Sequence, residues 1–367
     1  MAPTVVIAAG GTAGHVVPAL AVADALRADG ARVSFIGARD RLEATLVPEA
    51  GYEVDLLDLR GLDRHNPLRA ADAVRRAGIA VPRVRRLLRG RGADAVLGGG
   101  GYVAAPAGLA ALSLRLPLVL TEADRHLGLT NRALARRARR VCLAFPIEGR
   151  NGPRYVVTGR PVPAAIGAAD REAARRRFGI EEGDRCLLVF GGSQGARSIN
   201  LAALEAFAAA NAPAHDFHVL HISGSRDYGL ARETLGGEDA VPGYTLVEYE
   251  PGLADALAAS DLVLARSGGS IFEIAAARRP AILVPYPHAA GDHQRANAEW
   301  MADGGAAVVI DDAELDPARL RATAAELLRD PERLEAMARA SALLARPDAA
   351  ERVAGELLAA ISEPESR

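Results

Sequence analysis

A histidine that directly follows a glycine-rich loop is the first candidate for chemistry in this chain. Gly10–Gly14 follow a short apolar run, and His15 then opens a stretch with helical periodicity. Glycines let a ligand approach the backbone closely, and a helix N-terminus favours anions and disfavours an imidazolium ion. We therefore expect His15 to be a neutral imidazole that accepts a proton from a substrate at pH 7. The alternative is a histidine that only caps or packs the helix start.

Two more glycine loops stand between an apolar run and a helical stretch. Gly191–Gly195 contains Ser193 and Gln194, and its N–H groups and hydroxyl can hold a diphosphate without a metal ion. Arg266–Ser270 precedes a helix whose first turn carries Glu273, a carboxylate that can accept both hydroxyls of a ribose. A structural tight turn and a dipole-favoured helix start are the alternatives.

A polar stretch near the C-terminal third suits a sugar. Asp292–Asn297 includes Gln294, and buried sugar hydroxyls need paired donors and acceptors. The alternative is a capped helix start with Asp292 as the N-cap.

The basic residues narrow the chemistry further, because the chain contains no lysine. All 44 basic residues are arginines, which excludes a P-loop and Schiff-base or pyridoxal-phosphate chemistry. Any bound anion must be held by arginine, backbone N–H groups or helix dipoles. The two cysteines, Cys142 and Cys186, cannot form a four-cysteine zinc site. We expect neither a metal ion nor a cofactor.

Short β-branched apolar runs alternate with Ala/Leu/Arg-rich helical stretches, which predicts an α/β fold with parallel sheets covered on both faces. The predicted strands are Thr4–Ala8, Arg32–Ile36, Ala95–Leu97, Leu118–Leu120, Cys186–Phe190, His218–Ile222, Leu262–Ala265 and Ile282–Val284.

The two halves of the 367-residue chain repeat one another. The runs that start at Thr4, Ala95 and Leu118 each end in a glycine-rich or polar loop, and so do their counterparts in the second half. Loops at the carboxyl ends of parallel strands form ligand sites. We therefore predict two Rossmann-like domains that face each other across a cleft, over residues 1–160 and 164–342. Residues 343–367 form a last helix that can return to the first domain.

Composition excludes several classes of protein. The formal net charge of -2 argues against a nucleic-acid partner, and no apolar run reaches the length of a membrane-spanning helix. The N-terminus lacks the basic region of a signal peptide, so we expect no secretion.

One segment nevertheless suggests a membrane surface. Between Arg64 and Arg91 nine arginines interleave with apolar residues, and Arg83, Arg85 and Arg86 form the densest group. We expect a peripheral patch that docks on anionic lipid; solvated helix faces are the alternative. Gly78 and Pro82 interrupt the pattern and favour a short helix followed by a loop.

Five motifs in this order and spacing resemble the MurG family of GT-B glycosyltransferases over nearly the whole chain. They are GGTAGHVVPALAVA, LGGGGYVAAPAGLAA, GGSQGARSIN, ARSGGSIFEIAAA and DHQRANA. The resemblance implies the GT-B fold and a hexosyltransferase that makes lipid II from lipid I and UDP-N-acetylglucosamine (UDP-GlcNAc). Such an enzyme would act in peptidoglycan biosynthesis, on which cell shape and cell division depend. It would work as a peripheral protein at the cytoplasmic face of the cell membrane.

The resemblance also implies roles for individual residues. Thr12, Ala13 and Gly14 would line the donor sugar, and His15 would lie at the reaction centre. Beside His15 we take Glu122 as a second candidate, for acceptor contact or proton transfer. Ser193 would meet the diphosphate, Glu250 the uracil, Glu273 the ribose and Gln294 the sugar. The remaining donor candidates are Asp124, Arg160, Gln194, Arg266, Ser267 and Gly268, and Tyr102 is an acceptor candidate.

Three segments depart from the family pattern. T-G-G-H becomes Thr12–His15 with an added methyl group, and H-E-Q-N becomes Thr121–Asp124, which replaces an amide with an acceptor-only carboxylate. G-N-P-V-R becomes Gly159–Pro163, where Arg160 can replace the missing arginine.

We expect an inverting, metal-independent transfer in which His15 is the base. The helix after Ser193, together with Arg160, would stabilise the leaving diphosphate. The alternatives are a UDP-GlcNAc 2-epimerase, or a transferase that acts on another lipid or a secondary metabolite.

Overall fold

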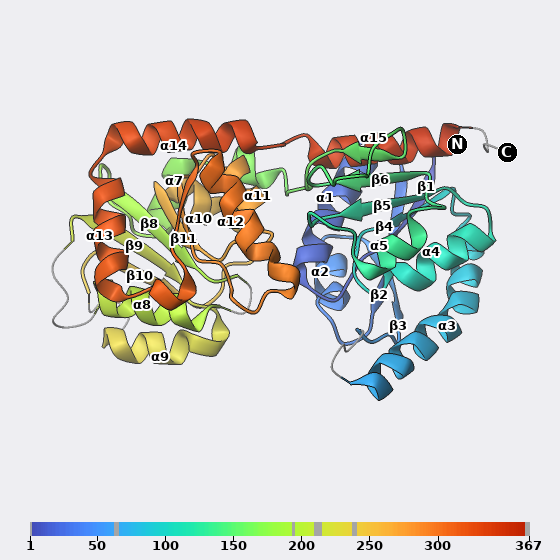
Figure 1. Ribbon diagram of the computed structural model, residues 1–367, viewed down its shortest axis with the longest axis horizontal. Coiled ribbons are helices and arrows are strands. Elements are labelled where there is room, and N and C mark those ends of the chain that lie inside the picture. The colour runs from blue at the N-terminus through green and yellow to red at the C-terminus, as the bar shows by residue number, and fades with distance from the viewer. Residues whose placement is uncertain (1, 62–65, 193–194, 209–214, 237–240, 364–367) are drawn as a thin grey trace. The chain divides into compact units, whose positions relative to one another are not determined.

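The computed structural model describes residues 2–61, 66–192, 195–208, 215–236 and 241–363. The chain forms two compact units, shown in Figure 1. Unit 1 comprises Met1–Pro163 and Arg346–Arg367, and unit 2 comprises Ala164–Ala345.

Unit 1 alternates strands and helices. Its elements are β1 (Thr4–Ala8), α1 (Ala13–Ala28), β2 (Arg32–Ala38), α2 (Glu43–Glu49), β3 (Glu53–Leu57), α3 (Pro67–Gly90), β4 (Ala95–Gly98), α4 (Ala104–Ser113), β5 (Leu118–Glu122), α5 (Leu129–Leu134), β6 (Arg140–Leu143), β7 (Tyr155–Val157) and α15 (Ala349–Ser362). The strands form one parallel sheet in the order β3-β2-β1-β4-β5-β6-β7.

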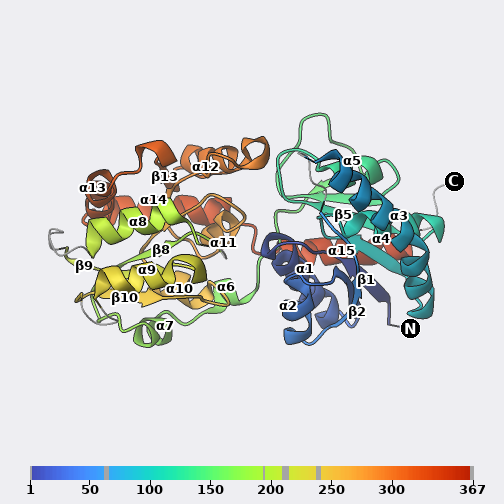
Figure 2. The same cartoon turned by 90° about the horizontal axis from the view of Figure 1, so that it is seen from below.

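Helices cover both faces of this sheet because its central strands are apolar on both sides. Val5 and Ile7 of β1 pack with α1, α2 and α15, whereas Val6 and Ala8 pack with α3, α4 and α5. Figure 2 shows the same two groups of helices on either side of the strands. The C-terminal helix α15 thus belongs to the core of unit 1.

Unit 2 has the same kind of architecture. Its elements are α6 (Ala165–Ala168), α7 (Arg171–Arg177), β8 (Arg185–Phe190), α8 (Arg197–Phe207), β9 (Phe217–Ile222), α9 (Ser225–Leu235), β10 (Tyr244–Val247), α10 (Ala254–Ala259), β11 (Leu262–Ala265), α11 (Ile271–Ala276), β12 (Ala281–Leu283), the 3-10 turn η1 (Ala290–Asp292), α12 (His293–Asp303), β13 (Ala307–Val309), the 3-10 turn η2 (Asp312–Glu314), α13 (Pro317–Leu328) and α14 (Pro331–Leu344). The strand order is β10-β9-β8-β11-β12-β13, again parallel.

The predicted internal repeat is confirmed by the two strand orders. β1, β4 and β5 of unit 1 occupy the same positions as β8, β11 and β12 of unit 2. In each sheet the strand order reverses between the first and the second of these strands. Ligand sites are expected at such a reversal, that is, at the carboxyl ends of β1 and β4 in unit 1 and of β8 and β11 in unit 2. The glycine loops singled out in the sequence follow these four strands.

The predicted short helix and loop around Gly78 and Pro82 is wrong, because α3 is a single helix of 24 residues with Pro82 inside it. A proline inside a helix lacks the N–H that would bond the carbonyl four positions earlier, and its ring crowds that carbonyl. For Pro82 this is the carbonyl of Gly78. Ala73, Ala80 and Val84 form part of a continuous buried stripe, and its packing outweighs the lost hydrogen bond. Among the described residues, no helix is long and apolar enough to cross a membrane.

Candidate active site

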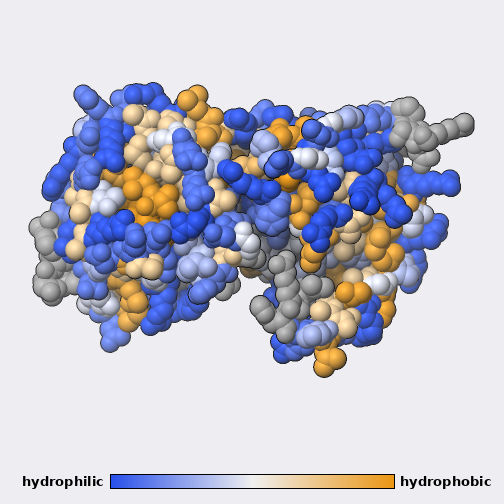
Figure 3. Space-filling view, viewed as in Figure 1, coloured by the Kyte–Doolittle hydropathy of each residue, from blue (hydrophilic) through white to orange (hydrophobic). Residues whose placement is uncertain are grey.

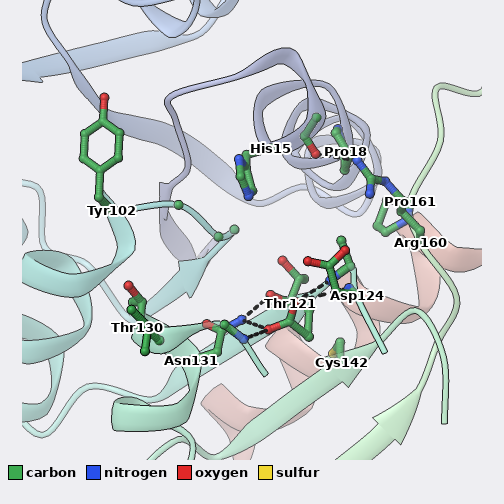
Figure 4. A pocket seen from close by; sticks show the side chains of 18 of the residues that line it. His15, Pro18, Tyr102, Thr121, Asp124, Thr130, Asn131, Cys142, Arg160 and Pro161 are labelled. Carbon is green, nitrogen blue, oxygen red and sulfur yellow. Dashed lines mark hydrogen bonds between the residues drawn. The ribbon is translucent and has the colours of Figure 1, made fainter. Parts of the chain in front are cut away.

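A pocket of about 390 Å³ lies in unit 1 at the carboxyl ends of β1, β4 and β5 (Figure 4). Three loops build it: the one that leads into α1, Gly99–Tyr102 after β4, and Ala123–Gly128 after β5. Arg160 and Pro161, which follow β7, close another side. The predicted residues Gly14, His15, Tyr102, Glu122, Asp124 and Arg160 all line this pocket.

His15 lies in the first turn of α1 and turns its ring toward the pocket (Figure 4). Thr12 is the N-cap, but its hydroxyl makes no capping hydrogen bond and lies 3.1 Å from Nδ1 of His15. The ring also packs on the β4 loop, since a Cβ added to Gly100 would lie 2.5 Å from Cδ2 of His15. Ala13 precedes His15 as the half-buried first residue of α1.

The environment favours a neutral His15. Burial of the ring is the main cause that lowers its pKa, and the positive charge of Arg160 acts in the same direction. Asp124 and Glu43 oppose this by raising the pKa. Because the lowering effects prevail, the ring can accept a proton at pH 7.

Glu122 makes a hydrogen-bonded clasp for the loop after β5. Oε1 accepts the N–H groups of Ala123 and Asp124 at 3.0 and 3.2 Å, and Oε2 accepts those of Gly128 and the Asn131 amide at 2.8 and 2.9 Å. Burial raises the pKa of this carboxyl. Four donors thus occupy the carboxylate, which suits it to hold the pocket wall in place.

Arg160 and Tyr102 hold the backbone around His15. Arg160 donates from Nη2 to the carbonyl of Gly14 at 2.6 Å, so its guanidinium is attached to the first turn of α1. The ring of Tyr102 lies against the β1 loop, where a Cβ on Gly11 would come within 3.1 Å of it. Cys142 also lines the pocket, and burial raises the pKa of its thiol to about 12, which makes it a poor nucleophile.

In unit 2 the loop after β11 packs against the start of α12. Ser267 is fully buried and donates to the carbonyl of Gln294 at 2.6 Å. Oε1 of Gln294 in turn accepts the N–H group of Tyr286 at 3.0 Å. A Cβ on Gly268 would lie 3.7 Å from Nε2 of Gln294. The structure therefore brings these three predicted donor residues together.

The guanidinium of Arg266 is committed to the fold of unit 2. It donates to Asp312 at 2.6 Å, to Ser198 at 2.8 Å and to the carbonyl of Val284 at 3.1 Å. These bonds connect the ends of β11 and β12 with α8. Arg266 was predicted to contact the UDP-sugar donor. Any such contact would come in addition to the hydrogen bonds that its guanidinium already makes within unit 2.

Glu273 and Glu250 lie on different elements of unit 2. Glu273 is half-buried in the first turn of α11. Glu250 follows β10, and Arg177 donates to both its carboxylate oxygens at 3.0 and 2.7 Å. Ser193 and Gln194 lie outside the described residues.

Glu43 does not line the pocket itself but contacts the loop that leads into α1, and it was not singled out from the sequence; neither was Asn131, which lines the pocket. Glu43 is fully buried, and its carboxylate accepts N–H groups from Gly11 and Ala38. A single glutamate at the start of a short helix carries no motif. Only the structure shows that Gly10 and Gly37 make room for it, because a Cβ at either position would collide with Glu43.

The sequence matches two family domains and curated relatives over almost its full length. Residues 5–143 match the glycosyltransferase family 28 N-terminal domain, and residues 186–353 match the glycosyltransferase family 28 C-terminal domain. A UDP-N-acetylglucosamine–N-acetylmuramyl-(pentapeptide) pyrophosphoryl-undecaprenol N-acetylglucosamine transferase from Moorella thermoacetica is 42% identical over 359 residues, which are 95% of this chain and 96% of the relative. The transferase of the same name from Halorhodospira halophila is 43% identical, with 96% of each chain covered. The chain belongs to this transferase family.

Solved structures agree with the family assignment. MurG from Acinetobacter baumannii superimposes with a TM-score of 0.74 at 29% identity, covering 97% of this chain and 99% of that one. UDP-GlcNAc 2-epimerase from Neisseria meningitidis superimposes with a TM-score of 0.67 but only 16% identity, over 98% and 100% of the two chains, and shares the fold alone. The resemblance to the MurG family and the assignment as a hexosyltransferase are thus confirmed.

Proposed function

We propose that this chain transfers N-acetylglucosamine from UDP-GlcNAc to the 4-hydroxyl of the N-acetylmuramic acid of lipid I, which forms lipid II in peptidoglycan biosynthesis. The observation that carries the proposal is the 42–43% identity to transferases of that name over 95–96% of the chain. The pocket of unit 1 supports the proposal, because it contains His15, whose pKa is lowered by burial. A neutral His15 can accept the proton of the acceptor hydroxyl.

In the proposed reaction the acceptor hydroxyl attacks the anomeric carbon in line. The new carbon–oxygen bond forms as the bond to UDP breaks, and the bonding electron pair leaves with the diphosphate. The proton of the hydroxyl passes to His15. One displacement inverts the anomeric configuration, and no covalent sugar–enzyme intermediate is needed.

Charge on the leaving diphosphate needs neutralisation in this scheme. The chain offers arginine rather than lysine for this purpose, and we assign Arg160 and the helix dipole of α8, after Ser193, to it. We propose that no metal ion takes part. On the donor side we assign the uracil to the region of Glu250, the ribose to Glu273, and the sugar to the group formed by Ser267, Gly268 and Gln294.

We also propose that α3 contacts an anionic membrane surface, so that the protein acts as a peripheral protein at the cytoplasmic face. Leu68, Val74 and Ile79 are 84%, 61% and 63% exposed, and Arg83 and Arg86 are exposed on the same helix. Figure 3 shows apolar side chains among hydrophilic ones over the part of unit 1 that carries α3. Exposed apolar groups next to arginines are typical of interfacial helices.

Incubation with UDP-GlcNAc, with and without a lipid I analogue, tests the proposed reaction. Release of UDP that requires the acceptor, together with a new disaccharide product, is the expected result. Conversion of the donor without any acceptor would instead indicate the epimerase.

A further inference from the structure

A buried carboxylate joins the ends of two strands next to the candidate active site. Glu43 starts α2 and is fully buried. Its Oε1 and Oε2 lie 3.2 and 3.0 Å from the N–H nitrogen of Gly11, and Oε1 also accepts the N–H of Ala38 at 2.9 Å. Gly11 follows β1 and Ala38 ends β2, so one side chain fixes the exit of both strands.

The surrounding residues leave room for this carboxylate and for little else. A Cβ on Gly10 would lie 2.1 Å from Oε1 of Glu43, and a Cβ on Gly37 would lie 2.6 Å from its Cγ. One glycine of the loop after β1 and one glycine inside β2 thus accommodate the same side chain. Gly11 itself has a φ of 99°, a conformation that other residues adopt only with strain.

The position of Gly10 and Gly11 determines where His15 lies. The hydroxyl of Thr12 does not cap α1, so the helix start receives no side-chain support from its own N-cap. The carbonyl of Gly10 lies against the β4 loop, 2.4 Å from where a Cβ of Gly101 would be. The adjacent Gly100 packs on the His15 ring. A shift of the loop after β1 would therefore move the backbone that carries His15. It would also move the β4 loop, against which the His15 ring packs.

The first glycine loop of a Rossmann-like domain commonly offers its N–H groups to a ligand phosphate. In unit 1 the Gly11 N–H is instead occupied by a carboxylate of the chain itself. We propose that Glu43 is a positioning residue for His15, which it fixes through the Gly11 backbone, and that the Gly11 N–H does not serve as a phosphate site. This inference rests on the proposed transfer reaction, in which His15 is the base.

Glu43 also acts on the charge balance at His15. The charged groups that affect this ring are Arg160, which lowers its pKa, and Asp124 and Glu43, which raise it. Removal of the Glu43 charge should lower the pKa of His15 further. A purely structural Glu43 would affect protein stability but would leave this pKa and the turnover of the folded protein unchanged.

The experiment compares Glu43→Gln, Glu43→Asp and the control Glu49→Gln, an exposed residue on the same helix. Melting temperature and UDP affinity by calorimetry report folding and the donor site. NMR titration of the His15 ring reports its pKa without any turnover, and kcat and the acid limb of kcat/KM report catalysis.

We expect Glu43→Gln to bind UDP like the wild type, to lower kcat by up to about 100-fold, as displacements near 1 Å can do, and to move both the ring pKa and the acid limb to lower pH. Glu43→Asp keeps the charge but is one methylene shorter, so its kcat should fall while the ring pKa stays close to the wild-type value. Glu49→Gln should match the wild type throughout.

Folded Glu43 variants with wild-type kcat and an unchanged His15 pKa would overturn the inference. If the wild type shows no transfer but Glu43→Gln still lowers the His15 pKa, the proposed function fails while the link between Glu43 and His15 stands.

Discussion

The hydroxyl of Thr12 lies 3.1 Å from Nδ1 of His15. If the ring N–H at Nδ1 donates to this hydroxyl, Nε2 carries the lone pair that accepts the proton of the substrate. Replacement by valine removes the hydroxyl at nearly constant volume, and we expect Thr12→Val to lower kcat by about 2- to 10-fold, the equivalent of one hydrogen bond. Thr12→Ser keeps the hydroxyl and should retain most of the activity. Equal rates for the two variants would show that this hydrogen bond does not orient the base.

The pH dependence of kcat/KM should report His15. A base whose pKa is lowered stays active until the pH falls through that pKa, so the acid limb should have its midpoint below the usual histidine value of about 6.5. Arg160→Gln removes a charge that lowers this pKa and should move the limb to higher pH.

His15→Ala should remove the limb and lower kcat by roughly 100-fold or more, with little change in UDP affinity. If the acid limb of kcat/KM persists in His15→Ala, a group other than His15 is responsible for it.

Glu273 should contribute to donor affinity. If its carboxylate accepts the ribose hydroxyls, Glu273→Ala weakens UDP binding by about 1.5 to 3 kcal/mol, the range for hydrogen bonds to a charged group. Calorimetry with UDP measures this, and Glu299→Ala, an exposed site on α12, is the matched control. Unchanged affinity would assign Glu273 to the start of α11 alone.

Activity should survive chelation by EDTA. The chain has no Asp-x-Asp pair. Glu122 and Asp124 are an acidic pair of similar spacing that lines the pocket, but the Glu122 carboxylate already accepts hydrogen bonds from backbone and amide N–H groups. Arginine and a helix N-terminus can neutralise the diphosphate without a cation. Loss of transfer on chelation that is restored by Mg²⁺ or Mn²⁺ would contradict this.

Binding to anionic vesicles should depend on α3. Arg75 and Arg76 pair with Asp72, so Arg83 and Arg86 are the better candidates for lipid contact. Each arginine near such a surface contributes about 1 kcal/mol, so Arg83→Glu with Arg86→Glu should weaken binding by at least about 30-fold.

The control variant, Arg176→Glu with Arg232→Glu, reverses the same number of charges on unit 2. Sedimentation with vesicles at two salt concentrations measures the binding of both variants. Equal binding to neutral and anionic vesicles would rule out the electrostatic patch.

The edge strands of both sheets could not be predicted from apolar runs in the sequence. No apolar run predicted β3, β6, β7, β10 or β13, and four of these five are the outermost strands of the two sheets. An edge strand has a neighbour on one side only and stays partly exposed, as in β3, where Glu53 and Asp55 alternate with apolar residues. A continuous apolar run marks only strands that are buried on both faces.

The sequence by itself determined the parallel α/β class, the internal repeat and the glycine loops, because each depends on local residue order: apolar runs form strands, and glycines end them. Only the tertiary structure decided the contacts at the site. Glu43 reaches Gly11 across 32 positions, and Arg160 reaches Gly14 across 146. It also decided that packing against α4 keeps α3 helical through Pro82. Such contacts form between segments far apart in the chain, so their partners follow from how the helices pack on the sheet and not from any local pattern.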